Sequence, residues 1–215
     1  MREKEVAKKL LEIKAIFLRP NEPFIWSSGI KTPIYCDNRL ILSYPDVRKI
    51  IEKELANLIK EKFSECEGIM GTSTAGIGHA AIVADILNLP MGYVRTKNKE
   101  HGRKNKIEGL ITENQKIVVI EDLISTGGSC IEVVNALREV GADVLGIVSI
   151  FTYDMEVAKE NLKAANITNY SCTNYDQLIT VAIENGYIKK EEKEQLLQFR
   201  NNPSGENWDI VRKIK

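Results

Sequence analysis

The stretch 116-KIVVIEDLISTGGSC-130 joins an apolar run to a segment of serine, threonine and glycine. Residues 117–120 are all apolar and β-branched, which is typical of a strand buried on both faces of a parallel sheet. Glu121 and Asp122 follow at once, and a buried strand rarely carries two carboxylates without partners for them. The stretch therefore predicts a central strand that ends at these two acids, at a functional site.

The chain around this strand alternates between helical and strand-like patterns from about residue 46 onward. Apolar residues recur at helical spacing over 46–63, 75–88, 128–142 and 154–166, and short apolar runs cover 67–72, 89–95, 143–151 and 167–172. Strands separated by helices of this length indicate parallel βαβ units. We predict an α/β fold with a doubly wound, mainly parallel central sheet flanked by helices, and residues 167–172 as an edge strand.

The N-terminal segment does not follow this alternation. Residues 1–18 predict an amphipathic surface helix, and 24-FIWSSGIKTPIYCD-37 places Gly29 and Pro33 between strand-like pieces. We expect a hairpin or small hood over about residues 1–45, to which the C-terminal segment can contribute. Residues 175–208 predict two helices and a polar tail, and we treat 1–215 as one domain.

Composition excludes several classes of function. Lys+Arg and Asp+Glu both total 30, so no overall basic field favours nucleic acid as a partner. No apolar run approaches the ~20 residues of a membrane span, and the start lacks a secretory leader, so we expect a cytoplasmic protein that binds no membrane. Four cysteines without a CxxC pair and two histidines suit neither a zinc site nor a Ser-His-Asp triad.

The segment after Glu121 and Asp122 has the composition of a phosphate-binding turn. Ser125, Thr126, Gly127, Gly128 and Ser129 lead into a predicted helix, whose N-terminal N–H groups attract anions. Because carboxylates repel phosphate, the two acids fit another part of the ligand, such as the vicinal hydroxyls of a ribose. The alternative is a capped strand–helix turn with solvated acids. GxxxxGK[ST] is absent, which disfavours a P-loop NTPase.

VVIEDLISTGGS is similar to the phosphoribosyl-pyrophosphate (PRPP) motif of the type I phosphoribosyltransferases, in which an apolar strand, two acids and a Thr/Gly loop follow one another. The resemblance implies that PRPP is bound by Glu121, Asp122, Leu123, Ile124, Ser125, Thr126, Gly127, Gly128 and Ser129. It also implies a pyrophosphate loop at Thr72, Ser73 and Thr74, which without the resemblance is an ordinary βα turn. The motif specifies the donor and leaves the acceptor base open.

A basic segment, 93-YVRTKNKEHGRKNKIEG-109, follows another predicted strand. Six Lys/Arg and one Glu lie between Arg95 and Lys106, and no aromatic residue is interleaved, which disfavours a nucleic-acid patch. It is either a solvated basic loop or a mobile loop whose cations neutralise a departing pyrophosphate. His101 could donate a hydrogen bond or a proton to the departing oxygens.

The pattern Arg95, Lys97, Lys99, His101 and Gly102 resembles the catalytic loop of the orotate phosphoribosyltransferases, and 24–40 resembles their hood. That resemblance implies transfer of a phosphoribosyl group from PRPP to orotate, with Mg²⁺ held mainly by PRPP and without direct protein ligands. It implies a homodimer in which the loop of one subunit serves the site of the other. Catalysis then falls to Lys97, Lys99 and His101, which together with Arg95 also bind PRPP. Orotate binding falls to Ser125, Lys31, Tyr35 and Arg39.

Several positions depart from this family pattern. Thr96, Ser27 and Ala75 stand where some members carry lysine, and Tyr153 stands where some use an arginine for the orotate carboxylate. Two alternatives therefore stay open, namely another base-specific phosphoribosyltransferase and a PRPP-sensing regulator that binds nucleic acid. His79, in the apolar helix over 75–88, is interpreted as a packed or solvent-facing residue without a catalytic role.

Overall fold

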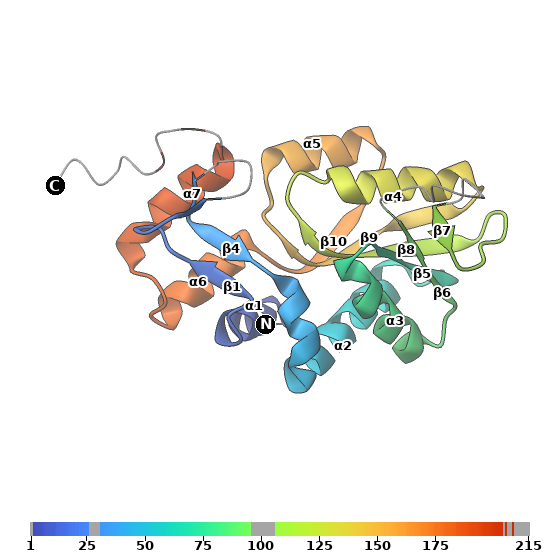
Figure 1. The fold of residues 1–215 in the computed structure, drawn as a ribbon, viewed down its shortest axis with the longest axis horizontal. Helices are drawn as coiled ribbons and strands as arrows, with labels where there is room; N and C mark the ends of the chain where they lie inside the picture. Colours follow the sequence, from blue (N-terminus) through green and yellow to red (C-terminus); the bar gives the residue numbers. More distant parts are fainter. Residues whose placement is uncertain (1, 26–30, 96–105, 204, 206–207, 209–215) are drawn as a thin grey trace.

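The computed structural model describes residues 2–25, 31–95, 106–203, 205 and 208 (Figure 1). Its centre is one six-stranded sheet, with the strands in the order β10-β9-β8-β5-β6-β7. The bounds are β5 Gly68–Thr72, β6 Met91–Val94, β7 Ile107–Glu108, β8 Lys116–Ile124, β9 Asp143–Thr152 and β10 Asn169–Asn174. Neighbouring strands are parallel except β6 and β7, which are antiparallel. The predicted mainly parallel sheet is confirmed, with β10 at one edge and the unpredicted β7 at the other.

Two pairs of helices cover the two faces of this sheet (Figure 1). Helices α2 (Pro45–Lys62) and α3 (Ala75–Leu87) lie on one face, and α4 (Gly128–Glu139) and α5 (Glu156–Ala164) on the other. The apolar residues 117–120 of β8 are therefore buried from both sides, with exposures of 1% or less. Gly141, at φ +86°, follows α4 in the left-handed conformation that glycine adopts without strain.

Strand β8 continues past the two acids, so the prediction that it ends there is wrong. It runs to Ile124 because β9 keeps pairing with it, with Glu121 opposite Ser149 and Leu123 opposite Phe151. Glu121 is buried within this strand, whereas Asp122 is half-buried.

The N-terminal segment forms a separate small layer. Helix α1 (Arg2–Glu12) is shorter than the predicted helix over 1–18, because Lys14 at φ +58° turns the chain into a strand. The other elements are β1 (Ile16–Leu18), β2 (Phe24–Ile25), β3 (Lys31–Thr32), β4 (Ile34–Cys36) and the 3₁₀ helix η1 (Asn38–Ser43). Strand β1 pairs with β4 and β2 with β3, both antiparallel. We refer to residues 16–43 as the hood.

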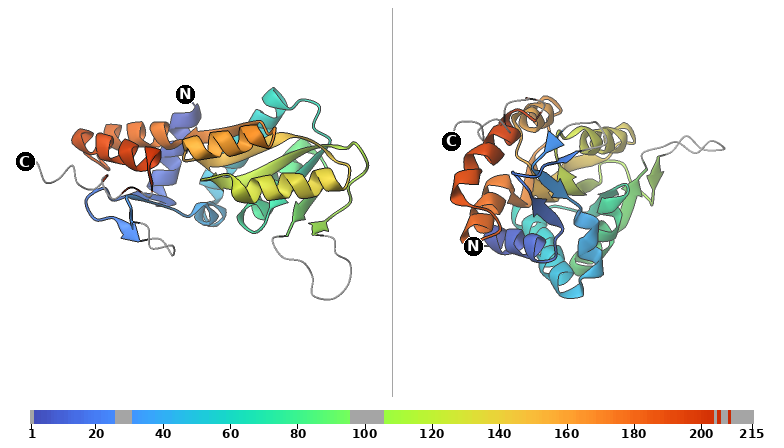
Figure 2. Two further views of the ribbon diagram at one scale, coloured as in Figure 1. Left: turned by 90° about the horizontal axis from the view of Figure 1, so that it is seen from above. Right: turned by 60° about the vertical axis from the view of Figure 1, so that its left-hand side comes forward.

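The C-terminal helices lie beside the hood, at the end of the molecule far from β6 and β7 (Figure 2). These are α6 (Tyr175–Glu184), the short η2 (Lys190–Glu192) and α7 (Lys193–Asn201). The Gln195 side-chain amide donates a hydrogen bond of 2.7 Å to the carbonyl of Pro20, and Lys4 forms an ion pair of 2.6 Å with Glu184. Within the described ranges, no helix is both long and apolar enough to cross a membrane.

Candidate functional site

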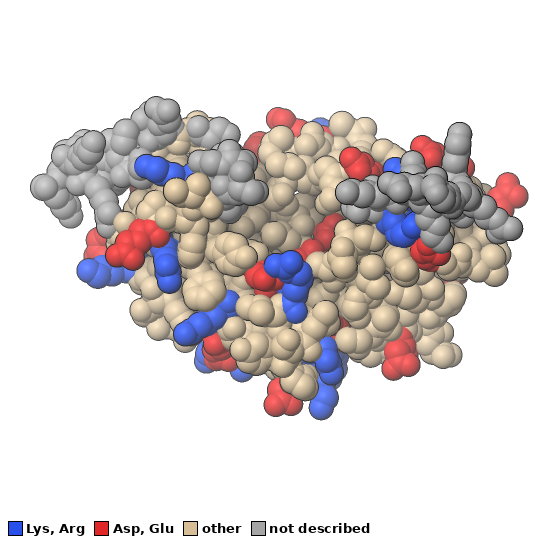
Figure 3. Space-filling view, in the orientation of Figure 1, with Lys and Arg blue, Asp and Glu red and all other residues tan. Residues whose placement is uncertain are grey.

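The chemistry-bearing segments meet at the carboxyl edge of the sheet. Strands β5, β8 and β9 are adjacent and parallel, so the segments that follow Thr72, Ile124 and Thr152 emerge at the same edge. Open α/β sheets bind ligands at this edge. Figure 3 shows the face of the molecule hollowed between the hood and the sheet, with acidic and basic side chains interspersed around it.

Glu121 is buried beneath this edge and bonded to two neighbouring elements. Its Oε1 accepts a hydrogen bond of 2.7 Å from the Thr72 hydroxyl, and its Oε2 accepts one of 3.4 Å from Ser129. Burial, and next the hydrogen bond with the Asp122 carboxyl, raise the pKa of Glu121 to about 8. A 5% exposed side chain thus links β5, β8 and the start of α4.

Asp122 is half-buried and held from the hood side. Asn38 is 1% exposed, and its side-chain amide donates a hydrogen bond of 2.7 Å to the Asp122 backbone carbonyl. This bond joins η1 to β8 across 84 positions of sequence. Asn38 was missed by sequence reasoning, because one asparagine after a strand carries no signal of a partner so far along the chain.

The predicted phosphate-binding turn forms the connection from β8 to α4. Gly127 takes φ +83° immediately before the helix, which is the left-handed conformation that glycine allows. A methyl group built on Gly128 meets no described atom within 4 Å, so a ligand can approach this backbone closely. Thr126 and Ser129 are exposed beside it, and the amide of Asn161 on α5 holds the Thr126 carbonyl at 3.0 Å. The turn has the geometry of an anion site at a helix N-terminus.

The predicted pyrophosphate loop follows β5 directly beside this turn. Two of its hydroxyls already have protein acceptors, since Thr72 donates to Glu121 and Ser73 donates to the Val94 carbonyl. Thr74 is exposed at the start of α3. The groups that the loop can offer to a ligand are therefore its backbone and the Thr74 side chain, rather than all three hydroxyls.

Only the base of the predicted catalytic loop belongs to the described residues. Arg95 follows β6, where its backbone N–H donates to the Lys106 carbonyl at 2.8 Å and its guanidinium forms an ion pair of 3.2 Å with Glu108. The antiparallel pairing of β6 with β7 thus brings the two ends of the loop together. Lys97, Lys99 and His101 lie outside the described residues, as does Ser27, and their predicted roles remain predictions.

The hood residues predicted for orotate differ in their surroundings. Arg39 is exposed and forms a double contact with Asp37, at 2.6 and 2.7 Å, which lowers the pKa of Asp37. The guanidinium of Arg39 is therefore engaged by this ion pair. Tyr35 is 41% exposed on β4, with its ring 5.7 Å from that of Phe24. Lys31 is exposed on β3.

Tyr153 belongs to the core rather than to the ligand-binding surface. It is 3% exposed, with its ring 5.4 Å from that of Phe151 and 5.9 Å from that of Tyr175, and burial raises its pKa. A group so enclosed cannot replace an exposed cation after β9. Ala75, the other departure among the described residues, is the first residue of α3.

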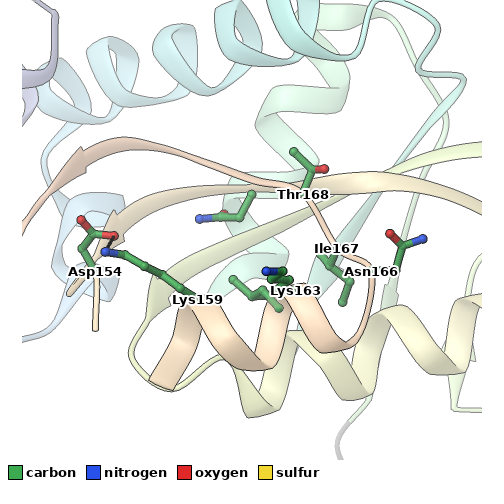
Figure 4. A pocket seen from close by; sticks show the side chains of 8 residues that line it. Asp154, Lys159, Lys163, Asn166, Ile167 and Thr168 are labelled. Atoms are coloured by element: carbon green, nitrogen blue, oxygen red, sulfur yellow. Dashed lines mark ion pairs between the residues drawn. The ribbon is translucent and has the colours of Figure 1, made fainter. Parts of the chain in front are cut away.

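A separate cavity of about 400 Å³ lies along α5 (Figure 4). Its lining includes Asp154, Lys159, Lys163, Asn166 and Asn169, and Lys159 pairs with Asp154 at 3.6 Å. None of the predicted site residues that the structure describes lines it. The candidate functional site is therefore taken at the carboxyl edge of the sheet, where the sequence motifs converge.

Comparison with known proteins identifies first the domain family of the chain and then the enzyme family within it. The model of the phosphoribosyl transferase domain matches residues 41–183, so the chain is built on this domain. The orotate phosphoribosyltransferase of Bacillus mycoides (strain KBAB4) is 60% identical over 205 residues, which cover 95% of this chain and 98% of that relative. The chain belongs to the orotate phosphoribosyltransferase family.

Solved structures agree with this assignment. Orotate phosphoribosyltransferase from Aeropyrum pernix superposes with a TM-score of 0.74 at 26% identity, covering 86% of this chain and 99% of that one. Leishmania donovani UMP synthase superposes at 0.79 with 24% identity, covering 93% of this chain and 42% of that one, which supports the fold. The predicted type I phosphoribosyltransferase fold is confirmed.

Proposed function

We infer that this chain is an orotate phosphoribosyltransferase, a pentosyltransferase that converts orotate and PRPP into orotidine 5′-monophosphate and pyrophosphate. This reaction belongs to the synthesis of pyrimidine nucleotides. The observation that carries the inference is the PRPP motif at the carboxyl edge of β8, in a chain 60% identical to a curated enzyme of this name over nearly its whole length. Neither alternative, another base as acceptor or a regulator without turnover, is the named activity of that relative.

We propose that the β8–α4 turn binds the 5-phosphate of PRPP and that the acids bind the ribose hydroxyls. Asp122 is half-buried at the edge, whereas the carboxylate of Glu121 is occupied by Thr72 and Ser129. Asp122 therefore makes the first contact with the ribose, and Glu121 keeps the two phosphate-binding loops in register beneath it. The pyrophosphate lies against the backbone of residues 72–74.

In the reaction, the C1′–oxygen bond to pyrophosphate breaks as a bond from C1′ to the orotate ring nitrogen forms. The ring nitrogen loses its proton as this bond forms, and a departing pyrophosphate oxygen or solvent water accepts it. The protein positions the two substrates and offsets the charge that develops on the departing oxygens. We assign the latter role to Arg95, Lys97, Lys99 and His101, and orotate binding to the hood side of the site near Ser125, Lys31, Tyr35 and Arg39.

The residues present fit Mg²⁺ as a partner of PRPP rather than as a resident metal. Among the described residues, no group of three or more potential metal ligands lies together, and the buried carboxylate of Glu121 is already bonded. Mg²⁺ keeps several waters and often binds through substrate phosphates. When bound it supplies positive charge to the pyrophosphate oxygens. We further propose a cytoplasmic homodimer whose basic loops, residues 95–106, act on the partner's site.

The test follows the loss of orotate absorbance with PRPP and Mg²⁺ present, and with either one omitted. We expect turnover that requires both, and we expect Asp122→Asn to lose most of it while Asp143→Asn, an exposed change at the opposite end of β9, retains it. Uracil, hypoxanthine and adenine are assayed in parallel. Turnover of one of these bases but not of orotate would replace the proposed acceptor.

A further inference from the structure

A histidine and a glutamate form a buried pair inside the molecule, and neither has a role in the proposed binding of substrates. His79 on α3 and Glu52 on α2 have side chains 0% and 1% exposed, and Nδ1 of His79 lies 2.5 Å from Oε1 of Glu52. The other buried residues of α2 are apolar: Val47, Ile51, Leu55, Ala56 and Ile59. Among the residues of α2, all of which the structure describes, Glu52 is therefore the single charged residue that is buried.

The pair is not saturated by hydrogen bonds. Oε2 of Glu52 and Nε2 of His79 are buried and have no hydrogen-bond partner among the described residues. Burial raises the pKa of Glu52, while the bond with His79 and the charge of Arg48 oppose that rise. Apolar side chains of similar volume would serve stability as well or better, since burying an ion pair often costs more than its attraction returns. A hydrogen bond between two buried side chains is directional, so it can fix the orientation of α3 on α2. Apolar packing alone fixes that orientation less strictly.

The helix that carries His79 begins at the pyrophosphate loop. Gly76, one turn before His79, is so closely packed that an added methyl group would lie 2.6 Å from both the Ile120 carbonyl and the Thr72 hydroxyl oxygen. A methyl group added to Gly78 would lie 3.0 Å from the side chain of Leu42 on η1. The first turn of α3 therefore has little room, and a rotation or shift of the helix is transmitted to Thr72 and Thr74.

We propose that Glu52 and His79 are positioning residues that fix the rotation of α3 on α2 and thereby hold residues 72–74 in the conformation that binds pyrophosphate. The inference rests on the proposed function, because it assigns these residues to the pyrophosphate side of the same site. Neither residue touches substrate. Their effect is on the binding of PRPP and of pyrophosphate, not on the orotate side.

The experiment separates positioning from stability by comparing single and double substitutions. Glu52→Leu and His79→Leu each leave one buried polar partner alone, so both lower the Tm. The double variant Glu52→Leu/His79→Leu removes both polar groups and regains a Tm close to that of the wild type. Glu52→Gln keeps an acceptor for His79, and Val83→Ala, a buried change further along α3, controls for lost packing.

Each variant is assayed for KM of PRPP, for kcat with orotate, and for Mg²⁺–pyrophosphate binding by calorimetry. For the double variant we expect a normal Tm with KM for PRPP and Kd for pyrophosphate raised on the order of tenfold, since misplacing a binding group by about 1 Å can cost roughly 10²-fold. Glu52→Gln retains near wild-type constants, and Val83→Ala lowers the Tm without changing either constant.

A double variant with wild-type Tm and wild-type constants would overturn the proposal, because the pair would then serve folding alone. If the double variant does not fold, His79→Gln takes its place, because its side-chain amide keeps a hydrogen-bond donor but places it further from the backbone. Its KM for PRPP and Kd for pyrophosphate are then compared with those of the wild type, provided that its Tm is normal. Unchanged constants there also overturn the proposal. Pyrophosphate binding does not depend on the acceptor base, so wild-type protein that binds pyrophosphate without consuming orotate contradicts only the proposed function.

Discussion

Glu121 and Asp122 are adjacent carboxylates that the fold places in unlike surroundings. Glu121 is buried, where Thr72 and Ser129 bond to it, whereas Asp122 is half-buried at the edge. Burial raises the pKa of Glu121, and neighbouring acids in unlike surroundings often acquire separate roles. A buried acid that retains its proton can bind two loops without repelling the phosphates nearby.

The stability of the protein should depend on pH through Glu121. Its pKa is about 8 when folded and near 4.5 when unfolded, so between these values the folded state holds a proton that the unfolded state has lost. The contribution of Glu121 to the free energy of unfolding therefore falls as pH rises through this window. We expect the wild type to lose a few kcal/mol relative to Glu121→Gln between pH 5 and pH 8, because each tenfold change in proton affinity between the two states corresponds to about 1.4 kcal/mol.

Urea unfolding of both proteins at several pH values measures this difference. The contributions of groups far from Glu121 are the same in the two proteins and cancel. A difference in unfolding free energy that stays constant between pH 5 and pH 8 would show that Glu121 ionises normally, in contradiction to the buried, bonded carboxylate described above.

Asn38 should matter more than its distance in sequence suggests. Asn38→Leu removes the donor to the Asp122 carbonyl and leaves that acceptor buried without its partner, which costs about 1–3 kcal/mol. Because the bond links the hood to the PRPP motif, we also expect KM to rise for both substrates. Urea unfolding and steady-state kinetics measure the two effects.

The matched control is Asn57→Ala, because among the described residues the side chain of Asn57 bonds within α2, to Glu54 at 3.4 Å. Asn57 is half-buried and its bond is long, so we expect its loss to change stability less than the loss of the Asn38 bond does. Wild-type stability and kinetics in Asn38→Leu would mean that the hood is held on the sheet by its apolar contacts alone.

At the scale of elements, the glycines in the first turns of α3 and α4, Gly76 and Gly128, have opposite surroundings. A methyl group on Gly76 meets protein atoms at 2.6 Å, whereas one on Gly128 meets no described atom within 4 Å. The first glycine is required for packing helix against strand. The second leaves open the space that we assign to the phosphate of PRPP, so the same substitution at the two positions should have different effects.

Gly128→Ala should leave stability within about 0.5 kcal/mol of the wild type, because the added methyl group has room. It should raise KM for PRPP roughly tenfold or more, since losing one hydrogen bond to a charged group costs about 1.5–3 kcal/mol. Thermal unfolding and PRPP titration at saturating orotate measure both quantities.

Gly76→Ala is the comparison for this experiment, and it should lower stability by about 1–3 kcal/mol through overpacking. If Gly128→Ala binds PRPP as tightly as the wild type, the 5-phosphate does not lie against the start of α4.

Most elements could be predicted from the sequence because periodicity depends on near neighbours. The residues of β8 and of the helix after it were enough to predict both the strand and the phosphate-binding turn. The pairing of β6 with β7 was not predictable, because β7 has two residues and no period of its own. Asn38 and the Glu52–His79 pair were equally hidden, since each depends on a partner that only the folded chain brings near. The path of β8 past its acids is likewise set by β9.

At the scale of the whole molecule, the site is assembled from segments that span most of the chain. The hood contributes Asn38, strand β5 the residues 72–74, and β8 with its turn the PRPP motif, while α7 contacts the hood through the bond from Gln195 to the Pro20 carbonyl. The basic loop leaves and rejoins the sheet at β6 and β7, on the opposite side of β5 from β8 and β9. Because the loop begins and ends away from the turn after β8, we test whether it acts on the site of a second subunit.

The last prediction tests whether the basic loop acts on the partner's site. Lys99→Ala disables the loop, and Asp122→Asn disables the ribose contact, so each homodimer is inactive alone. In a mixed dimer, one site combines an intact Asp122 with the partner's intact Lys99, and the other site has both defects. If the loop acts in trans, an equal mixture that has been unfolded and refolded together should regain about a quarter of wild-type activity, because half the dimers are mixed and each has one good site. If each loop serves its own subunit, every site in the mixture carries a defect and no activity returns.

The control is a mixture of Lys99→Ala with Lys97→Ala, in which both defects lie on loops. Its mixed dimers have no site free of a defect, so they stay inactive under either arrangement. Activity in the first mixture but not in the second therefore assigns the loop to the neighbouring subunit, and size-exclusion chromatography of the same samples shows that the dimers have formed.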